Sequence, residues 1–182
     1  MSVRNKGSFS EYLLLSVTMF TFDQLTTAVA NFQFTAVDIK GTPCALINRE
    51  LLPAAAKALK EQFGFTHFID ICSIDRFERK ERFEITYNLR NPETKERIFL
   101  KVRCEERDPH IPSVTSIWSG ANWNEREAYD MIGVIFTGHP DMRRMYLPED
   151  FTYYPMRKDF PLMGVPGSIP LPVDEHLKTR LN

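Results

Sequence analysis

The sequence predicts an α+β domain, with helices on one face of a mixed or antiparallel sheet, followed by a short helix and an extended proline-rich C-terminal arm. Helical and strand-like patterns alternate in the order helix, strand, strand, helix and three strands, which is typical of this class. Seven of the 12 prolines follow residue 139. We therefore divide the chain into an N-terminal tail (1–20), an α+β domain (21–133) and an arm (134–182).

The N-terminal tail contains an apolar run, Tyr12–Phe22. A membrane-spanning helix needs about 20 apolar residues, and this run has about half that number. A secretory signal would also need small residues at a cleavage site after the run, and none occurs there. The run is expected either to pack on another surface or to form a poorly ordered tail.

The first half of the domain combines two helices with two short strands. A helix is predicted at Phe22–Phe32, where Thr21 and Gln24 form a capping-box pattern. Strands are predicted at Thr35–Ile39 and Cys44–Asn48. The second helix is expected at 51–63, because Pro53 suits its first turn and Gly64 is a typical stop.

Three further strands complete the predicted sheet. Phe65–Ile74 is nearly continuous in apolar residues, which is typical of a strand covered on both faces. Phe83–Leu89 and Ile98–Cys104 alternate between apolar and polar residues, and the turn-forming residues 91–95 separate them. These two strands are predicted to form an antiparallel hairpin with one face in water.

The last helix, predicted at Trp123–Ile132, begins after Asn122 as its cap and ends before Gly133. Its charged residues have two interpretations: a solvated surface, or pairing with another chain. Arg126 and Asp130 are four residues apart and are expected to pair with each other. The charged residues concerned are Glu125, Arg126, Glu127 and Asp130.

The arm combines many prolines with large apolar residues. Prolines prevent a stable helix, whereas a disordered segment would lack large apolar side chains. We infer an ordered arm that lies on a neighbouring protein; the alternative is that it folds back on its own domain. Its arginines are expected to meet carboxylates of this chain or of a partner. The apolar residues are Met142, Met145, Tyr146, Leu147, Phe151, Tyr153, Tyr154, Met156, Phe160, Leu162 and Met163.

No pattern in the sequence indicates a cofactor, metal or catalytic site. The three cysteines, Cys44, Cys72 and Cys104, are far apart and are expected to be small core residues. His139 is expected to be a hydrogen-bonded structural histidine. The alternative is an acid–base pair of His139 with Glu125 or Asp141 in a stand-alone enzyme. His67, His110 and His176 have no neighbours at metal-binding spacing.

The charge balance argues against two classes of partner. There are 23 basic and 24 acidic residues, which gives a formal net charge of -1. Nucleic-acid binding usually requires a basic domain with clustered Lys and Arg, and an anionic membrane surface attracts a polybasic stretch. The sequence has neither feature.

Several blocks share their order and spacing with one family. Glu125-Arg126-Glu127 is followed by Gly138–Asp141, by Arg143-Arg144, and by a block that holds Pro155, Arg157, Lys158 and Asp159. With Asp70–Asp75 and Phe83–Val102, these blocks resemble the 30 kDa subunit family of respiratory complex I, which in bacteria is the C subunit of NADH-quinone oxidoreductase. The similarity is strong over 65–163 and weak over the first 60 residues.

The resemblance implies a non-catalytic structural subunit of the peripheral arm of a proton-translocating NADH:quinone oxidoreductase. It implies that FMN, iron–sulfur clusters and quinone lie on other subunits and that this chain binds no cofactor. The implied partners are the large quinone-site subunit and the iron–sulfur subunits, on the cytoplasmic side of the cell inner membrane. The implied interface residues are Glu125, Arg126, Glu127, Asp130, His139, Pro140, Asp141, Arg143, Arg144, Pro155, Arg157, Lys158 and Asp159.

Two differences from the family refine this expectation. Family members commonly carry Trp followed by a Gly-His pair before the second block, where this chain has Phe151 and 152–154, so the local arm contacts are expected to differ. The length of the chain predicts the form without a fused large subunit. The alternative function is the same scaffold role in a plastoquinone- or ferredoxin-linked relative or in a membrane-bound hydrogenase.

Overall fold

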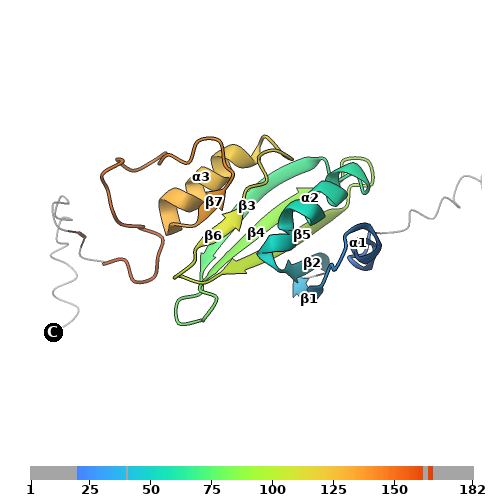
Figure 1. The fold of residues 1–182 in the computed structure, drawn as a ribbon, viewed down its shortest axis with the longest axis horizontal. Helices are drawn as coiled ribbons and strands as arrows, with labels where there is room; N and C mark the ends of the chain where they lie inside the picture. The colour runs from blue at the N-terminus through green and yellow to red at the C-terminus, as the bar shows by residue number, and fades with distance from the viewer. Residues whose placement is uncertain (1–19, 40, 162–163, 166–182) are drawn as a thin grey trace, which may run out of the picture.

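A computed structural model describes residues 20–39, 41–161 and 164–165 of the chain. A five-stranded sheet with the strand order β1-β2-β5-β4-β3 forms its centre (Figure 1). All neighbouring strands are antiparallel except β2 and β5, which are parallel. The mixed sheet confirms the predicted fold class. The strands are β1 (Phe34–Ile39), β2 (Thr42–Ile47), β3 (His67–Asp75), β4 (Phe83–Arg90) and β5 (Arg97–Cys104).

The two longer helices, α2 (Leu52–Glu61) and α3 (Ala121–Ile132), lie on the same face of this sheet (Figure 1). Helix α2 follows a short 3-10 turn, η2 (Arg49–Leu51), and Pro53 lies in its first turn, as predicted. Gly64 follows the helix with a φ of 72°, a conformation that glycine adopts without steric cost. The core fills the space between these helices and the sheet.

The first helix is shorter than the sequence predicts. Helix α1 covers Asp23–Ala28 only, and no side chain caps its first turn. The Gln24 side chain does accept a hydrogen bond from the Thr21 backbone N–H, so half of the predicted capping box forms. Val29 is already in an extended conformation, and Phe32 is buried separately from the helix. The apolar periodicity therefore continues beyond the helix itself.

Strand β3 contradicts the expectation that it is covered on both faces. It is an edge strand, and only Asp75 among its nine residues is fully buried. Helix α3 packs against it, but Ile69 and Ile74 remain 37% and 39% exposed. The apolar run correctly predicts a strand, but the prediction that both faces of this strand are covered is wrong. Periodicity does not reveal which neighbours a strand has.

Strand β4 contradicts the expectation of a wet face. All of its residues except Arg90 are buried. Glu84, on the polar face, pairs with Lys101 and Arg103 of the adjacent strand β5, with N–O distances of 2.7 Å in both pairs. The long basic side chains of β5 therefore shield the polar face of β4 from water. The predicted hairpin with β5 does form, and Asn91 accepts two backbone hydrogen bonds in its turn.

Two short strands were not predicted. Strand β6 (His110–Pro112) precedes α3, and β7 (Ile135–Thr137) follows it, and the two pair in parallel as a second, two-stranded sheet. The chain between them, residues 113–134, therefore leaves the two-stranded sheet and returns to it, and this segment includes α3. Among the described residues, no helix has the length and apolar content that crossing a membrane requires. The predicted 1–20 tail lies outside the described residues, except for Phe20.

Candidate partner interface

Helix α3 carries two fully buried carboxylates, Glu125 and Asp130. Glu125 accepts hydrogen bonds from the Ser113 hydroxyl at 2.7 Å and from the Val114 backbone N–H at 2.8 Å. No cation pairs with it among the described residues. Burial raises the pKa of Glu125 to about 7, although both hydrogen bonds oppose the shift. Glu125 therefore belongs to the core of the chain, and not to a solvated surface.

Asp130 holds the start of the arm. It accepts hydrogen bonds from three consecutive backbone N–H groups, those of residues 145–147, at 2.7–3.1 Å. The Arg144 guanidinium pairs with the other carboxylate oxygen at 2.7 Å. Burial alone would raise the pKa of Asp130, but these donors outweigh burial and lower it. The predicted pairing of an arm arginine with a carboxylate is thus confirmed within the chain.

The predicted pair of Arg126 with Asp130 does not form. Arg126 donates instead to the backbone carbonyl groups of Arg143 and Arg144, at 3.0 and 3.2 Å. Helical spacing alone predicted the wrong partner, because the arm brings a better-placed guanidinium to Asp130. Arg143 is exposed and pairs with Asp141 at 2.7 Å. Glu127 is exposed on the same helix.

The middle of the arm packs on the end of α3. Gly133 ends the helix with a φ of 80°. A Cβ atom at this position would lie 2.7 Å from both the Tyr154 ring and the Arg157 guanidinium. Arg157 donates to the Ile132 carbonyl at 2.7 Å and stacks on the Tyr154 ring with a centroid distance of 4.4 Å. Gly133 is therefore required both for its backbone conformation and for the close approach of the arm.

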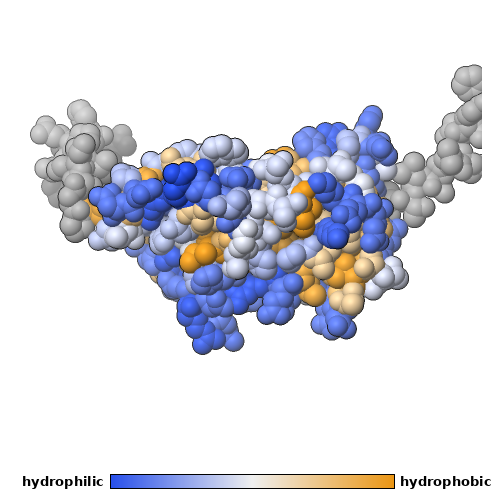
Figure 2. Space-filling view, turned by 45° about the horizontal axis from the view of Figure 1, so that its top comes forward, coloured by the Kyte–Doolittle hydropathy of each residue, from blue (hydrophilic) through white to orange (hydrophobic). Residues whose placement is uncertain are grey.

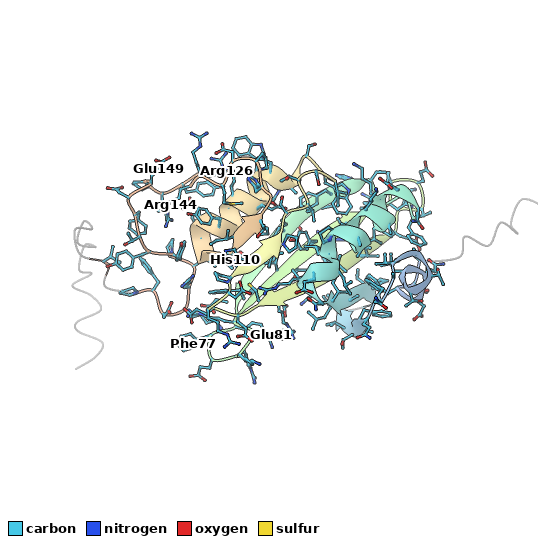
Figure 3. The ribbon with its side chains drawn as sticks, in the orientation of Figure 1. Phe77, Glu81, His110, Arg126, Arg144 and Glu149 are labelled. Carbon is cyan, nitrogen blue, oxygen red and sulfur yellow. The ribbon has the colours of Figure 1, made fainter. Side chains whose placement is uncertain are left out.

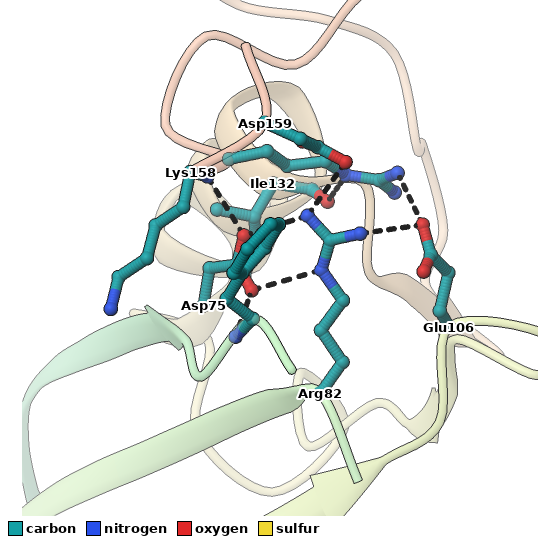
Figure 4. Close-up of polar contacts among 8 residues, drawn as sticks. Asp75, Arg82, Glu106, Ile132, Lys158 and Asp159 are labelled. Carbon is teal, nitrogen blue, oxygen red and sulfur yellow. Dashed lines mark hydrogen bonds and ion pairs between the residues drawn. The ribbon is translucent and has the colours of Figure 1, made fainter. Parts of the chain in front are cut away.

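After Asp130, a second carboxylate that anchors the arm is Asp75 at the end of β3, which binds the arm at Lys158 (Figure 4). It accepts two hydrogen bonds from Arg82, at 2.8 and 2.9 Å, and one from the Lys158 backbone N–H at 2.8 Å. Arg82 also pairs with Glu106 and with Asp159 of the arm, at 2.7 and 2.9 Å. Burial opposes ionisation of Asp75, but its donors prevail and lower its pKa to about 2.

This second cluster was missed by reasoning from the sequence. Asp75 directly follows the predicted strand Phe65–Ile74, and Arg82 lies outside the predicted strand Phe83–Leu89. Nothing in their spacing relates them to the arm, since Lys158 lies 83 residues after Asp75. One signal was present in the sequence: Arg82 directly precedes the predicted strand, where a cation that becomes buried needs carboxylate partners.

His139 is hydrogen-bonded through both ring nitrogens. Its Nε2 lies 3.2 Å from the Asn122 carbonyl oxygen, and its Nδ1 accepts the Asp141 backbone N–H at 3.0 Å. This confirms the predicted structural histidine. No hydrogen bond joins the His139 ring to a carboxylate in the described part of the chain. The structure therefore does not bring together the alternative acid–base pairs with Glu125 or Asp141.

The cysteines follow the prediction in two cases of three. Cys44 and Cys104 are buried, whereas Cys72 on β3 is exposed, and all three are free thiols. The described residues include no group of three or more His, Cys, Asp or Glu side chains that could hold a metal ion. His176 lies outside the described residues.

The described part of the arm contacts its own domain along residues 139–161, which is the alternative that the sequence left open. Pro140 is exposed and Pro155 is half-buried. Contact with the domain does not use all of the arm, since Tyr146 and Met156 are 63% and 64% exposed. That the outer side of the arm lies on a neighbouring protein stays a prediction. Leu162, Met163 and the last three prolines are outside the described residues.

Comparisons with known proteins relate the chain to one family. The sequence model described as the 30 kDa subunit of respiratory-chain NADH dehydrogenase matches residues 45–166. The C subunit of NADH-quinone oxidoreductase from Sinorhizobium medicae is 52% identical over 103 residues, or 57% of this chain and 51% of that protein. The chain thus spans about half the length of that relative. The corresponding protein of Roseiflexus sp. is 36% identical over 142 residues, or 77% of this chain and 82% of that protein.

Two solved structures share the fold. The trypsin-resistant fragment (1-134) of Nqo5 has a TM-score of 0.55 and 34% identity, and the match covers 59% of this chain and 89% of the fragment. A chain of the archaeal membrane-bound sulfane sulfur reductase has a TM-score of 0.65 and 23% identity, with 78% and 84% covered. The second likeness concerns the fold alone.

Proposed function

Because this chain belongs to the 30 kDa subunit family of respiratory-chain NADH dehydrogenase, we propose that it is a non-catalytic structural subunit of a proton-translocating NADH:quinone oxidoreductase. In this proposal it sits in the peripheral arm, on the cytoplasmic side of the cell inner membrane. It packs on the large quinone-site subunit and on iron–sulfur subunits. FMN, iron–sulfur clusters and quinone are bound by those other subunits.

The observation that carries this proposal is the clamped arm. Its two internal anchors, Asp130 and Asp75, use buried charges to hold a segment without regular secondary structure. Large side chains of that segment remain exposed, which is typical of a surface that another protein covers. A scaffold of this kind would hold its neighbours in a fixed relative position, and electron transfer between cofactors depends on such distances.

The experiment is a purification of the complex through this subunit. A tagged chain is expected to migrate on a native gel in a membrane-associated assembly that oxidises NADH with quinone. Deleting the gene should abolish the assembled complex and its activity, and the intact gene should restore both. The purified chain alone should show no turnover. Finding only free monomer in respiring cells would contradict the proposal.

The same scaffold role in a related complex is the second candidate. The fold likeness to a chain of the sulfane sulfur reductase, an archaeal respiratory membrane complex, favours considering it. The electron donor in such complexes is decided by other subunits. The proteins that copurify with the tagged chain would therefore separate an NADH-linked complex from a ferredoxin-linked, plastoquinone-linked or hydrogenase-type relative.

A further inference from the structure

We propose that the polar face of the sheet binds an acidic segment of another protein through a row of basic side chains, formed by His67, Arg90 and Arg97. This basic row is separate from the arm and from the charge clusters that hold the arm. The inference goes beyond the proposed function and does not depend on it, because binding can be measured on the free chain.

The strand register places the three side chains of the basic row side by side. His67 of β3 lies opposite Arg90 of β4, and Arg90 lies opposite Arg97 of β5. Residues directly opposite each other in an antiparallel pair point to the same face. The next residue, Ile98, is buried in the core, so the basic row lies on the face away from α2 and α3. All three side chains are exposed, and the row spans about 10 Å across three strands.

The two arginines of the basic row face each other without a carboxylate that pairs with them. Among the described residues, neither Arg90 nor Arg97 forms an ion pair. Like charges directly opposite each other on neighbouring strands destabilise a sheet. Elsewhere on the same face the charges are balanced, since Glu84 pairs with Lys101 and Arg103. A bound anion would therefore relieve the repulsion within the row.

Arg97 is held in an orientation that suits a carboxylate. Its Nε donates to the Asn88 side chain at 2.7 Å, and its guanidinium lies 5.0 Å from the centre of the Phe99 ring. Its two terminal nitrogens have no hydrogen-bond partner within the described part of the chain. A guanidinium with both terminal N–H groups available can bind the two oxygens of one carboxylate. Because these contacts already fix the side chain, little conformational freedom is lost on binding.

Nearby carboxylates do not neutralise the basic row. Asp70 lies on the same face, opposite Asn88, but it is exposed and forms no ion pair in the ranges that the structure describes. The adjoining hairpin turn adds exposed residues of both signs, Glu93 and Lys95. Glu96 is engaged by a backbone N–H and by the hydroxyl of residue 94. Asp70 is therefore expected to compete with a bound anion without replacing it.

The basic row lies at the end of the sheet away from the arm. His67 begins β3 and Asp75, which binds the arm, ends it, so the two residues are about 25 Å apart along the strand. The hairpin turn beside the row accepts the Phe20 N–H, close to α1. Figure 3 shows Arg144 and Glu149 of the arm at the opposite end of the molecule from α1. The contacts of the arm therefore leave the row accessible.

An extended polypeptide segment fits the basic row better than a small molecule does. The row is on an exposed sheet surface, whereas small-molecule sites are concave. Carboxylates two residues apart in an extended segment are separated by about 7 Å, which two arginine side chains on neighbouring strands can reach. The face of the molecule in Figure 2 is mainly hydrophilic, with its apolar residues in separate areas, so charge is the main feature that it offers a partner. The occupant is therefore a segment with at least two Asp or Glu residues.

The first test titrates the purified full-length chain with hexaglutamate and follows its backbone amides by NMR. Saturable shifts are expected at the three residues of the basic row, and hexaglutamine should cause none. Arg90→Gln with Arg97→Gln should weaken binding at least about fivefold, whereas Asp70→Asn should strengthen it. The matched control is Arg79→Gln with Lys80→Gln in the loop after β3, which changes the net charge equally and should bind normally.

The stability of the variants separates a binding role from a structural one. Arg90→Gln alone breaks no side-chain hydrogen bond among the described residues and removes one of two opposed cations. Its urea unfolding midpoint should stay unchanged or rise, while its binding of hexaglutamate weakens. A lower midpoint with unchanged binding would show that Arg90 supports the sheet, and would overturn its assignment to the basic row.

Three other results would overturn the acidic segment as the occupant. Hexaglutamate shifts that the double arginine variant leaves unchanged would place binding elsewhere. Binding of inorganic pyrophosphate to the row without binding of hexaglutamate would assign the row to a small oxyanion. A dimer of the free chain that the double variant abolishes would assign the row to a second copy.

The second test examines the same surface in the assembly isolated from cells. In Arg90→Lys, a carbodiimide should join the substituted side chain to an Asp or Glu of another protein, and mass spectrometry would identify both residues. A link to Asp70 of the same chain only, or no link, would overturn the acidic partner. If the chain never copurifies with subunits of an NADH:quinone oxidoreductase, the proposed function fails, but both tests of the basic row remain valid because neither presumes which protein the partner is.

Discussion

At the scale of single residues, helix α3 shows how local donors decide the charge state of a buried carboxyl. Glu125 and Asp130 are both inaccessible to solvent. Asp130 receives a guanidinium and three N–H groups and has a lowered pKa, whereas Glu125 receives two neutral donors and has a raised pKa. Glu125 also lies deeper in the chain than Asp130, so its stronger desolvation and its weaker donors together account for the difference in pKa.

Glu125 predicts a measurable dependence of stability on pH. Its pKa is raised from 4.5 to about 7 in the folded chain, so the folded state binds more protons than the unfolded state between these values. The contribution is fully present below the unfolded pKa and is lost as pH rises towards 7. Relative to Glu125→Gln, the free energy of unfolding of the wild type should fall by about 3 kcal/mol from pH 4 to pH 8.

Urea unfolding at several pH values measures this difference. Glu127→Gln on the same helix is the control, because Glu127 is exposed. A difference between wild type and Glu125→Gln that stays constant from pH 4 to pH 8 would show that Glu125 does not change its proton occupancy on folding.

Gly133→Ala separates backbone strain from steric conflict. Gly133 and Gly138 both have positive φ, at 80° and 86°. A Cβ at Gly133 would meet Tyr154 and Arg157 at 2.7 Å, whereas a Cβ at Gly138 has nothing within 4 Å. Both alanine variants should be destabilised by roughly 1–2 kcal/mol from the backbone. Gly133→Ala should lose more and should also release the arm amides, as seen by hydrogen exchange; equal losses would argue against the close contact.

At the scale of elements, the position of each strand in the sheet explains which predictions failed. The apolar run of β3 predicts a strand covered on both faces and the alternating pattern of β4 predicts one face in water, but β3 is the edge strand and β4 is buried on both faces. The polar face of β4 is covered by Lys101 and Arg103 from β5. Such cross-strand cover depends on register and strand order, which a single strand pattern does not contain.

Cys72 tests the edge position of β3. In the folded chain this thiol is exposed, whereas Cys44 and Cys104 are 2% and 3% exposed and burial raises the pKa of both, that of Cys104 to about 12. An aromatic disulfide reagent should therefore modify one thiol per native chain rapidly, and three after unfolding. Cys72→Ser should remove the rapid phase. Rapid modification of two or more thiols in the native chain would contradict the burial of β2 and β5.

At the scale of the whole molecule, the arm is part of the domain through charge clusters that span long sequence distances. Arg82 joins Asp75, Glu106 and Asp159, which come from a strand, a loop and the arm (Figure 4). Asp75 and Arg82 are buried whereas Glu106 and Asp159 are exposed, so it is the loss of Arg82 or of Asp75 that would leave an uncompensated buried charge. The cluster therefore couples the stability of the arm to that of the sheet.

Arg82→Met should destabilise the chain by about 3–5 kcal/mol at neutral pH, because Asp75 would remain buried without its guanidinium. The pKa of Asp75 is lowered to about 2, so its contribution is present above its unfolded pKa and is lost as pH falls through 2. The difference from wild type in urea unfolding should shrink accordingly at low pH. Arg79→Met, at an exposed neighbour, should change stability by less than about 0.5 kcal/mol; a similar loss in both variants would refute the cluster.

Much of this architecture could be predicted from local patterns, and the rest depends on distant contacts. The hairpin of β4 and β5, the second helix and the Gly133 stop follow from periodicity and turn residues. The partner of Arg126, the exposure of Cys72 and the Asp75–Arg82 cluster do not, since each is decided by segments that lie far apart in the sequence. The candidate interface residues could be named from the blocks that resemble the family. The sequence does not show which of them, such as Asp130, contact this chain and which are exposed.

The parallel pairing of β2 with β5 has a consequence for synthesis of the chain. Cys44 of β2 pairs with Phe99 of β5, and the Asp75 carboxylate accepts the Lys158 backbone N–H. Each contact can form only after the later of its two residues has been synthesised. During translation, β2 therefore leaves the ribosome before its partner β5 has been made. The contact of Asp75 with Lys158 forms later still, after the sheet strands have been synthesised. Until β5 has been synthesised, the edge of β2 that pairs with it is open and is a surface for chaperones or for aggregation.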